Sequence, residues 1–142
     1  EVDRYLGTWY EIARLDHSFE RGLSRVSASY SLREDGGIDV VNRGFDAAAG
    51  EWKEVLGRAY FVDSPDVGHL KVSFFGPFYG SYAVFGLDRV DYGYAFVSGY
   101  DNDYLWLLAR EPIVGPEVKA EFEERAAALG FETETLIYVE HP

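Results

Sequence analysis

Short segments in which apolar and polar residues alternate run through most of the chain. The clearest covers residues 26–33, where Val26, Ala28, Tyr30 and Leu32 alternate with three serines and an arginine. Side chains of a β-strand point alternately to opposite faces, so this pattern predicts a strand with one buried and one solvated face. Comparable segments predict further strands at 9–16, 38–43, 52–62, 69–74, 82–88, 94–100 and 103–110.

The segments between these predicted strands are short and contain turn-forming residues. Residues 34–37 read Glu-Asp-Gly-Gly, which is a hairpin signal, and further turns are expected at 46–50, 63–66 and 101–103. Loops are expected at 17–23 and, with several aromatic residues, at 75–80. Eight consecutive strands with hairpin-like connections predict an all-β protein, an eight-stranded up-and-down antiparallel β-barrel.

One segment near the end of the chain has a helical period instead. Pro116 suits the first turn of a helix and Gly130 suits its C-terminal end. The apolar residues between them recur every three or four positions, at Val118, Phe122, Ala126 and Leu129. An amphipathic helix needs an apolar surface to cover, so we expect it on the barrel wall, followed by a short final strand at 136–139.

Three residues from the two ends of the chain predict how the barrel is closed. Gly7 permits a tight turn before Trp9, whose indole is large enough to fill a barrel floor. Arg110, at the end of the last barrel strand, is expected to stack on Trp9, a cation–π contact worth about 0.5–2 kcal/mol. The alternative is that Trp9 anchors an ordinary core strand.

This arrangement determines which side chains are expected inside. If Arg110 points inward, Tyr104, Trp106 and Leu108 share its face, while Leu105, Leu107 and Ala109 point outward under the helix. The same alternation from Trp9 predicts that Glu11, Ala13 and Leu15 point inward and that Tyr10 and Ile12 point outward. The expected ligand-binding residues of the interior are Leu15, Ala28, Tyr30, Val40, Asn42, Tyr60, Val72, Phe74, Tyr82, Trp106 and Leu108.

The sequence pattern leaves the filling of the interior, the inward faces of two strands and the partner of Glu11 undecided. An eight-stranded barrel either holds one small ligand or is filled by its own side chains. In strands 82–88 and 94–100 the alternation does not decide which face is inside, so Tyr82, Val84 and Phe96 are weaker predictions. A buried Glu11 must be paired, either with Arg58 or with Arg110; alternatively Arg58 or Tyr60 receives a ligand carboxylate or phosphate.

Composition narrows the class of protein. The 142 residues indicate one domain, 1–142, and the net charge of −12 disfavours binding to nucleic acid. The chain has no cysteine, and its three histidines, His17, His69 and His141, lack the spacing of metal ligands. No nucleophile elbow, phosphate-binding loop or dinucleotide fingerprint is present in the sequence. We therefore expect no catalytic residues, no metal and no cofactor.

Gly7 and Trp9, Asp103 and Tyr104, and Arg110 resemble the three signature regions of the lipocalins. The wider segments 5–14, 19–23, 71–80 and 103–106 resemble the bacterial outer-membrane branch of that family, with apolipoprotein D and the plant temperature-induced lipocalins as eukaryotic relatives. The resemblance covers essentially the whole chain. It implies an eight-stranded calyx closed below by the Trp–Arg pair, with a C-terminal helix on its wall.

The resemblance also implies a function. A lipocalin of this branch would bind, store or transport a fatty acid or lysophospholipid in the calyx, without catalysis. Bacterial members carry an N-terminal signal and a lipid-modified cysteine, which implies an outer-membrane lipoprotein facing the periplasm. The chain as written has neither, so we expect it to be soluble, with membrane association only through such an anchor.

Two alternatives of a different kind remain at the sequence level. The acidic wall and the aromatic loops are compatible with an interaction module, including a homodimer. The absence of both Met and Cys is compatible with an engineered calyx that binds a synthetic ligand such as a fluorogenic dye.

Overall fold

The computed structural model describes residues 2–15, 23–62, 69–75, 78–88, 91–99 and 105–139, and the side chains of these residues except 2, 3, 74, 75 and 78–81. Within these ranges nine strands form one antiparallel sheet. The strands are β1 (Gly7–Arg14), β2 (Leu23–Leu32), β3 (Ile38–Asp46), β4 (Glu51–Phe61), β5 (His69–Phe75), β6 (Phe78–Leu87), β7 (Tyr94–Ser98), β8 (Leu105–Ala109) and β9 (Ile137–Tyr138).

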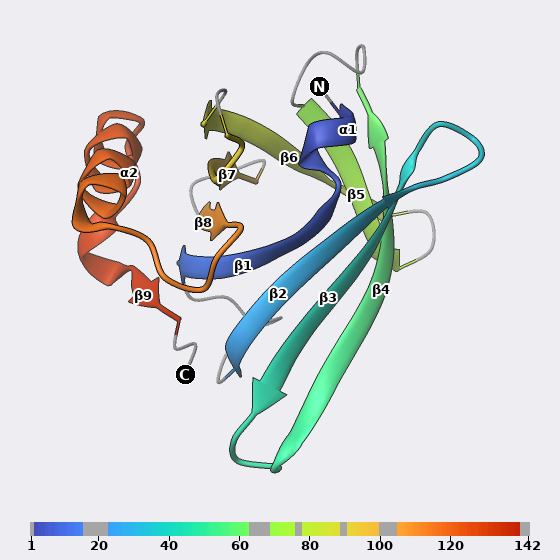
Figure 1. Cartoon of the computed structure of the whole chain (residues 1–142), viewed down its shortest axis with the longest axis horizontal. Helices are drawn as coiled ribbons and strands as arrows, with labels where there is room; N and C mark the ends of the chain where they lie inside the picture. Colours follow the sequence, from blue (N-terminus) through green and yellow to red (C-terminus); the bar gives the residue numbers. More distant parts are fainter. Residues whose placement is uncertain are drawn as a thin grey trace.

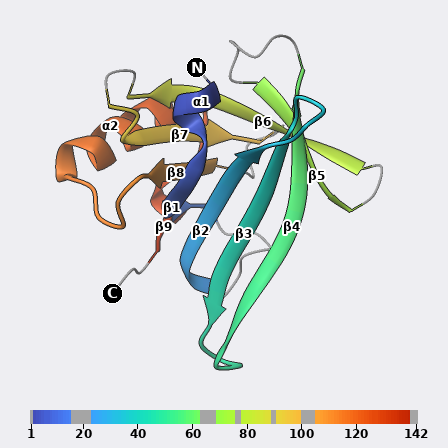
Figure 2. The ribbon, with the colours of Figure 1, turned by 45° about the vertical axis from the view of Figure 1, so that its right-hand side comes forward.

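The first eight strands pair in the order of the chain, and β8 returns to β1. Because β1 also pairs with β2, from Gly7 opposite Tyr30 to Tyr10 opposite Ser27, the sheet closes on itself. The predicted eight-stranded up-and-down barrel is therefore confirmed (Figure 1). The hairpin of β3 and β4 extends beyond the rest of the barrel, at the end opposite the short helix α1 (Val2–Tyr5), as Figure 2 shows.

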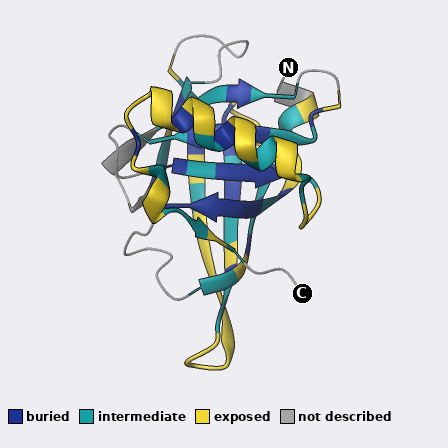
Figure 3. Ribbon diagram, turned by 90° about the vertical axis from the view of Figure 1, so that its left-hand side faces the viewer, coloured by how far each residue is buried: buried dark blue, intermediate teal, exposed yellow. Residues whose placement is uncertain are grey.

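The helix α2 (Pro116–Ala128) lies against the outside of the barrel, as predicted. Pro116 is at its first turn, and Gly130 follows its C-terminal end with φ of +94°, the left-handed conformation that glycine adopts readily. Its inward face buries Phe122 and Ala126, and its outward face is exposed (Figure 3). A short 3-10 turn, η1 (Thr133–Thr135), leads to β9, which pairs with the end of β1.

Two apolar clusters share the core. The buried members of the interior cluster are Trp9, Ala28, Tyr30, Ile38, Val40, Ala59, Leu70, Ala95, Val97 and Leu108. The wall cluster lies between the barrel and α2 and contains Ile12, Ala13, Leu15, Phe96, Leu105, Leu107, Ala109, Phe122, Ala126 and Phe131. Strand β8 contributes to both clusters, which explains why its sequence is apolar on both faces.

A bulge in β1 changes the predicted alternation. Glu11 lies opposite Leu108, whereas Ala13 lies opposite Leu107, so two steps along β1 correspond to one step along β8. Leu108 belongs to the interior cluster and Leu107 to the wall cluster. The extra residue therefore reverses the faces of β1 beyond this point.

The reversal corrects two predictions. Ala13 and Leu15 belong to the wall cluster, so the prediction that they face the interior is wrong. Arg14 takes the inward position instead, opposite Trp106. A single inserted residue is enough to do this because the side-chain period of a strand is two.

The register of β4 corrects a third prediction. Ala59, between Ile38 of β3 and Val72 of β5, belongs to the interior cluster, and Val72 packs against that cluster. Tyr60 and Arg58 are therefore on the outer face, and their predicted inward orientation is wrong. The segment 52–62 is not strictly alternating, so its sequence did not reveal the register.

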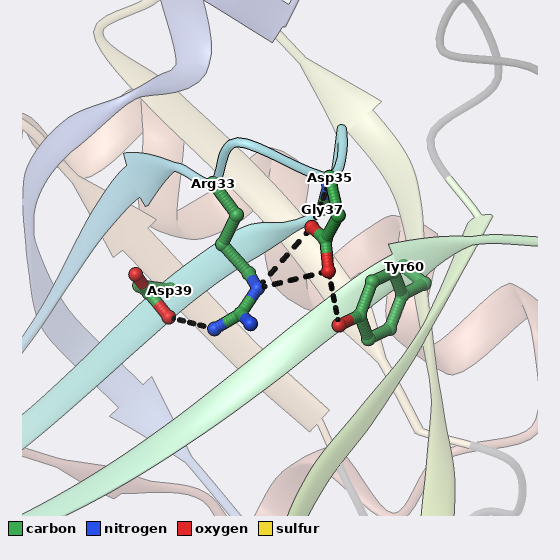
Figure 4. Close-up of polar contacts among 5 residues, drawn as sticks. All are labelled: Arg33, Asp35, Gly37, Asp39 and Tyr60. Carbon is green, nitrogen blue, oxygen red and sulfur yellow. Dashed lines mark hydrogen bonds and ion pairs between the residues drawn. The ribbon is translucent and has the colours of Figure 1, made fainter.

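On the outer face Tyr60 joins a polar cluster at the turn between β2 and β3 (Figure 4). Its hydroxyl donates to the Asp35 carboxylate at 2.9 Å, and the Gly37 N–H donates to the same carboxylate at 3.0 Å. Arg33 pairs with Asp35 at 3.3 Å and with Asp39 at 2.6 Å. The Gly37 hydrogen bond, followed by that of Tyr60, lowers the pKa of Asp35, so these contacts favour its charged form.

Two loop predictions also change. Strand β5 extends to Phe75 and β6 begins at Phe78, so most of the predicted loop 75–80 belongs to a hairpin. Of the predicted loop 17–23, residues 17–22 lie outside the described part of the chain, and Leu23 begins β2. The short helix α1 was not predicted.

Candidate ligand-binding site

The barrel floor is built from the start of β1 and the residue after β8. The Trp9 side chain is 0% exposed, and its indole N–H donates to the Tyr5 carbonyl at 2.7 Å. The Arg110 guanidinium carbon lies 3.9 Å from the centre of the Trp9 ring. The expected stacking of Arg110 on Trp9 is therefore present.

The same guanidinium ties the N-terminal segment to the floor. It donates to the carbonyls of Thr8 at 3.0 Å, Arg4 at 2.7 Å and Leu6 at 2.8 Å. Gly7 lies between these acceptors with φ of +100°, and a β-carbon there would be 3.4 Å from Arg110 Nη1. Glycine is suited to this position because it combines a left-handed backbone with a close approach to the guanidinium.

Three tyrosines form a polar cluster inside the barrel above the floor. The hydroxyls of Tyr5 and Tyr82 are 2.5 Å apart, and those of Tyr30 and Tyr82 are 3.1 Å apart. The Tyr5 ring packs on Trp9 at 4.8 Å between ring centres. Burial raises the pKa of both Tyr5 and Tyr82 well above the ordinary value, and the neighbouring Tyr30 raises both further.

These raised pKa values predict how stability depends on alkaline pH. The neutral tyrosines make their full contribution to the free energy of unfolding at pH values below about 10, the pKa of a tyrosine in the unfolded chain. Above it, the free energy of unfolding should fall by up to about 1.4 kcal/mol per pH unit for each buried tyrosine. In Tyr82→Phe this fall should be shallower than in the parent chain when urea unfolding is measured from neutral pH to above about pH 10.

The control for this experiment is Val84→Ala, which shortens an inward-facing side chain that does not titrate. It should lower stability by a similar amount at every pH. Identical slopes in Tyr82→Phe and the parent chain would contradict the assignment of Tyr82 as a neutral phenol held by hydrogen bonds inside the barrel.

Most of the predicted interior residues share the interior face. Ala28, Tyr30, Val40 and Leu108 are buried members of the interior cluster, and Val72, Tyr82 and Trp106 pack against it partly exposed. Asn42 lies opposite Ala28 on the same face and is also partly exposed. Leu15 and Tyr60 lie elsewhere, as described above, and the side chain of Phe74 is outside the described part of the structure.

The structure adds interior residues that sequence reasoning missed or left undecided. Phe61, Val84 and Leu87 pack against the interior cluster, and Leu70, Ala95 and Val97 are buried in it. Phe96 lies in the wall cluster, with its ring centre 5.2 Å from that of Phe122 on α2. Leu70 and Val72 are two residues apart, so the alternation of a strand puts them on one face, whereas Phe96 is assigned to the wall only once the position of α2 is known.

A buried ion pair lies inside β1. Glu11 is 3% exposed and Arg14 2% exposed, and their carboxylate and guanidinium approach to 3.3 Å. Arg14 Nη2 also donates to the Leu23 carbonyl at 3.3 Å, across to the beginning of β2. Glu11 is thus paired with Arg14, and the prediction of a Glu11–Arg58 or Glu11–Arg110 pair is replaced by this contact.

The described residues contain neither a metal-binding cluster nor a membrane-spanning helix. No group of three or more potential metal ligands lies together in the described part of the chain. Among the helices formed by the described residues, none has the length and apolar character needed to cross a membrane.

A closed antiparallel barrel with an apolar interior and a covering helix defines the class of calyx-shaped binding proteins. The family described as Lipocalin-like domain matches residues 1–141, and the chain belongs to this lipocalin family. Lipocalins are binding proteins for small lipophilic molecules, and this general function extends to the chain.

Individual relatives agree with this assignment. The chain is 60% identical over 140 residues to outer membrane lipoprotein Blc of Vibrio cholerae, covering 99% of this chain and 82% of that protein. It is 31% identical over 144 residues to bovine apolipoprotein D, covering 96% of this chain and 74% of that protein. The crystal structure of the cockroach allergen Per a 4 superimposes with a TM-score of 0.76 at 22% identity, covering 100% of this chain and 88% of the allergen, and this likeness concerns the fold.

Proposed function

We propose that the chain binds a fatty acid or a lysophospholipid in the barrel interior, as a store or carrier, without catalysing a reaction. The observation that carries this proposal is the partial exposure of inward-facing apolar side chains. Phe61, Val72, Val84 and Trp106 face the interior of a closed barrel but are not fully buried. A barrel filled by its own side chains would bury them, so their exposure supports an interior that receives a ligand.

The chemistry of the interior favours a ligand with a long apolar tail. Its walls are aliphatic and aromatic, and each Å² of apolar tail surface removed from water contributes about 25 cal/mol. The polar groups on this face include the tyrosine hydroxyls near the floor, Asn42 on β3 and the Glu11–Arg14 pair on β1. We place the tail among the apolar walls and the head group toward the end where the β3–β4 hairpin projects.

The relatives suggest where this activity takes place. The Vibrio cholerae relative is named an outer membrane lipoprotein, and we extend that location, facing the periplasm, to this chain. Binding lipid there requires no catalytic residue.

A matched pair of variants tests the binding site. Delipidated protein should bind palmitate or palmitoyl-lysophosphatidylcholine saturably with one-to-one stoichiometry. Tryptophan fluorescence measures this binding, since Trp106 is on the interior face. Val84→Phe adds bulk inside the barrel and should weaken binding about tenfold. Ala83→Phe places a phenylalanine on the outer face of the same strand, with a larger increase in volume, and should leave affinity unchanged.

The results separate the carrier from the alternative interaction module. If the protein bound neither lipid, or if Val84→Phe and Ala83→Phe weakened lipid binding equally, the calyx would be rejected as the binding site. A mass that rises with protein concentration in the absence of lipid binding would then favour a homodimer. Such an interaction surface would use the projecting hairpin, where Val55 is 44% and Leu56 66% exposed.

A further inference from the structure

A groove on the outer face of β1 to β4 is separate from the barrel interior. It has a volume of about 510 Å³, and its lining includes Tyr10, Arg25, Ser27, Arg43, Trp52 and Glu54. Ser27 lies opposite Arg43, and Arg43 lies opposite Glu54, so these three side chains form one row across β2, β3 and β4. Because Ala28 and Asn42, their neighbours in sequence, face inward, this row points away from the calyx.

Two arginines meet in this groove. The Arg43 guanidinium carbon lies 4.2 Å from the centre of the Trp52 ring, and that of Arg25 lies 5.3 Å from the centre of the Phe45 ring. The two rings are themselves edge to face, 5.4 Å apart. Stacking uses the flat face of a guanidinium and leaves the N–H groups at its edge available to donate hydrogen bonds to a ligand.

The groove carries two arginines on a molecule that is acidic as a whole. The chain carries a net charge of −12, yet neither Arg25 nor Arg43 forms an ion pair with any residue that the structure describes. Arg33, by contrast, is paired with Asp35 and Asp39. The groove is therefore a positively charged patch held in place by aromatic rings.

The backbone at Arg25 is strained. The pairing of β2 with β3 shifts between Ser24 and Ser27, and Arg25 has φ of +54°, the left-handed region that non-glycine residues rarely occupy. Bulges of this kind redirect a side chain and are frequent beside functional sites. Here the bulge accompanies the placement of Arg25 over Phe45, next to the Arg43–Trp52 stack.

We propose that this outer groove binds a phosphate group between Arg25 and Arg43. Guanidinium groups bind phosphate oxygens through paired N–H donors, and the Ser27 hydroxyl in the same row is a further donor. Glu54 is on the other side of Arg43 and repels an anion, so it limits the affinity. The phosphate belongs either to a soluble phosphate compound or to the head group of an anionic lipid at a membrane surface.

Nuclear magnetic resonance of the arginine Nε–Hε groups tests the site with inorganic phosphate at constant ionic strength. The signals of Arg25 and Arg43 should shift and saturate. Arg25→Gln and Arg43→Gln should each weaken phosphate binding about tenfold. Glu54→Gln should strengthen it, because the variant removes the repelling charge and keeps the shape of the side chain.

The matched control is Arg58→Gln, which removes an exposed arginine from the outer face of the same strand as Glu54 but outside the groove. It should bind phosphate like the parent chain. The proposal would be wrong if Arg58→Gln weakened phosphate binding as much as Arg25→Gln and Arg43→Gln do. It would also be wrong if phosphate caused no saturable shift at Arg25 and Arg43 and the protein did not bind vesicles.

Vesicles identify the source of the phosphate. Sedimentation with phosphatidylglycerol vesicles but not with phosphatidylcholine vesicles, lost in Arg25→Gln and Arg43→Gln, would assign the groove to an anionic lipid head group. Binding of inorganic phosphate without vesicle sedimentation would assign it to a soluble phosphate compound. Vesicle binding that persists in both arginine variants would count against the groove.

Discussion

Arg14→Met should be among the most destabilising single substitutions in this chain. It removes the guanidinium that lies 3.3 Å from the Glu11 carboxylate while both side chains are almost completely buried. Removing one partner of a buried ion pair costs about 3–5 kcal/mol, because the remaining carboxylate loses its attraction to this guanidinium in a poorly solvated place. Urea unfolding followed by circular dichroism at neutral pH measures this loss directly.

The double variant Glu11→Leu/Arg14→Met separates the ion pair from the packing of Arg14. Replacing both charged groups by apolar side chains also removes the buried carboxylate, so the double variant should be about 2 kcal/mol more stable than Arg14→Met. Arg33→Met, which removes an ion-paired arginine from the surface turn, is the control and should have a much smaller effect. A double variant no more stable than Arg14→Met would show that the pair itself is not what stabilises β1.

Trp9→Ala should lower the free energy of unfolding by about 3–5 kcal/mol. The substitution empties the floor, removes the hydrogen bond to the Tyr5 carbonyl and leaves Arg110 without the ring on which it stacks. It also removes the ring against which Tyr5 packs, so α1 should detach from the barrel at lower denaturant concentration than the strands do. Circular dichroism is the appropriate measurement, since the substitution removes one of the three fluorescent tryptophans.

Trp52→Ala is the matched control for the floor. Trp52 is 43% exposed on the outer face, where it stacks with Arg43 and Phe45, and its loss should cost less than about 1 kcal/mol. Similar losses in the two variants would mean that Trp9 stabilises the protein no more than a surface tryptophan. The role of a barrel floor would then be wrong for Trp9.

Much of the fold was predictable because its signals are local. The alternation of Val26, Ala28 and Tyr30 predicted β2 and its inward face, and the helical spacing of Phe122 and Ala126 predicted the buried side of α2. A strand or helix that is half buried must carry its apolar residues at the period of its backbone. Such patterns can be recognised without knowing what covers them.

The candidate site was less predictable because it depends on register. The bulge in β1 turns Leu15 to the wall and Arg14 to the interior. The chemistry of these side chains did not reveal this, because both faces of β1 pack against apolar residues and a long arginine side chain can pack its methylene groups against either. In β4 the apolar residues do not alternate strictly, so Tyr60 was assigned to the wrong face. One residue of shift exchanges the two faces of a strand, and nothing in the local composition at these places opposes it.

The sequence by itself determined the order of the strands, the covering helix and the residues of the floor, since each follows from periodicity or from a rare combination such as Gly7, Trp9 and Arg110. Only the tertiary structure decided that Glu11 pairs with Arg14 and that Arg25 and Arg43 meet on the outer face. These contacts depend on bulges and on pairing between strands. A bulge depends on how two neighbouring strands pair, so its position is determined only when the barrel closes.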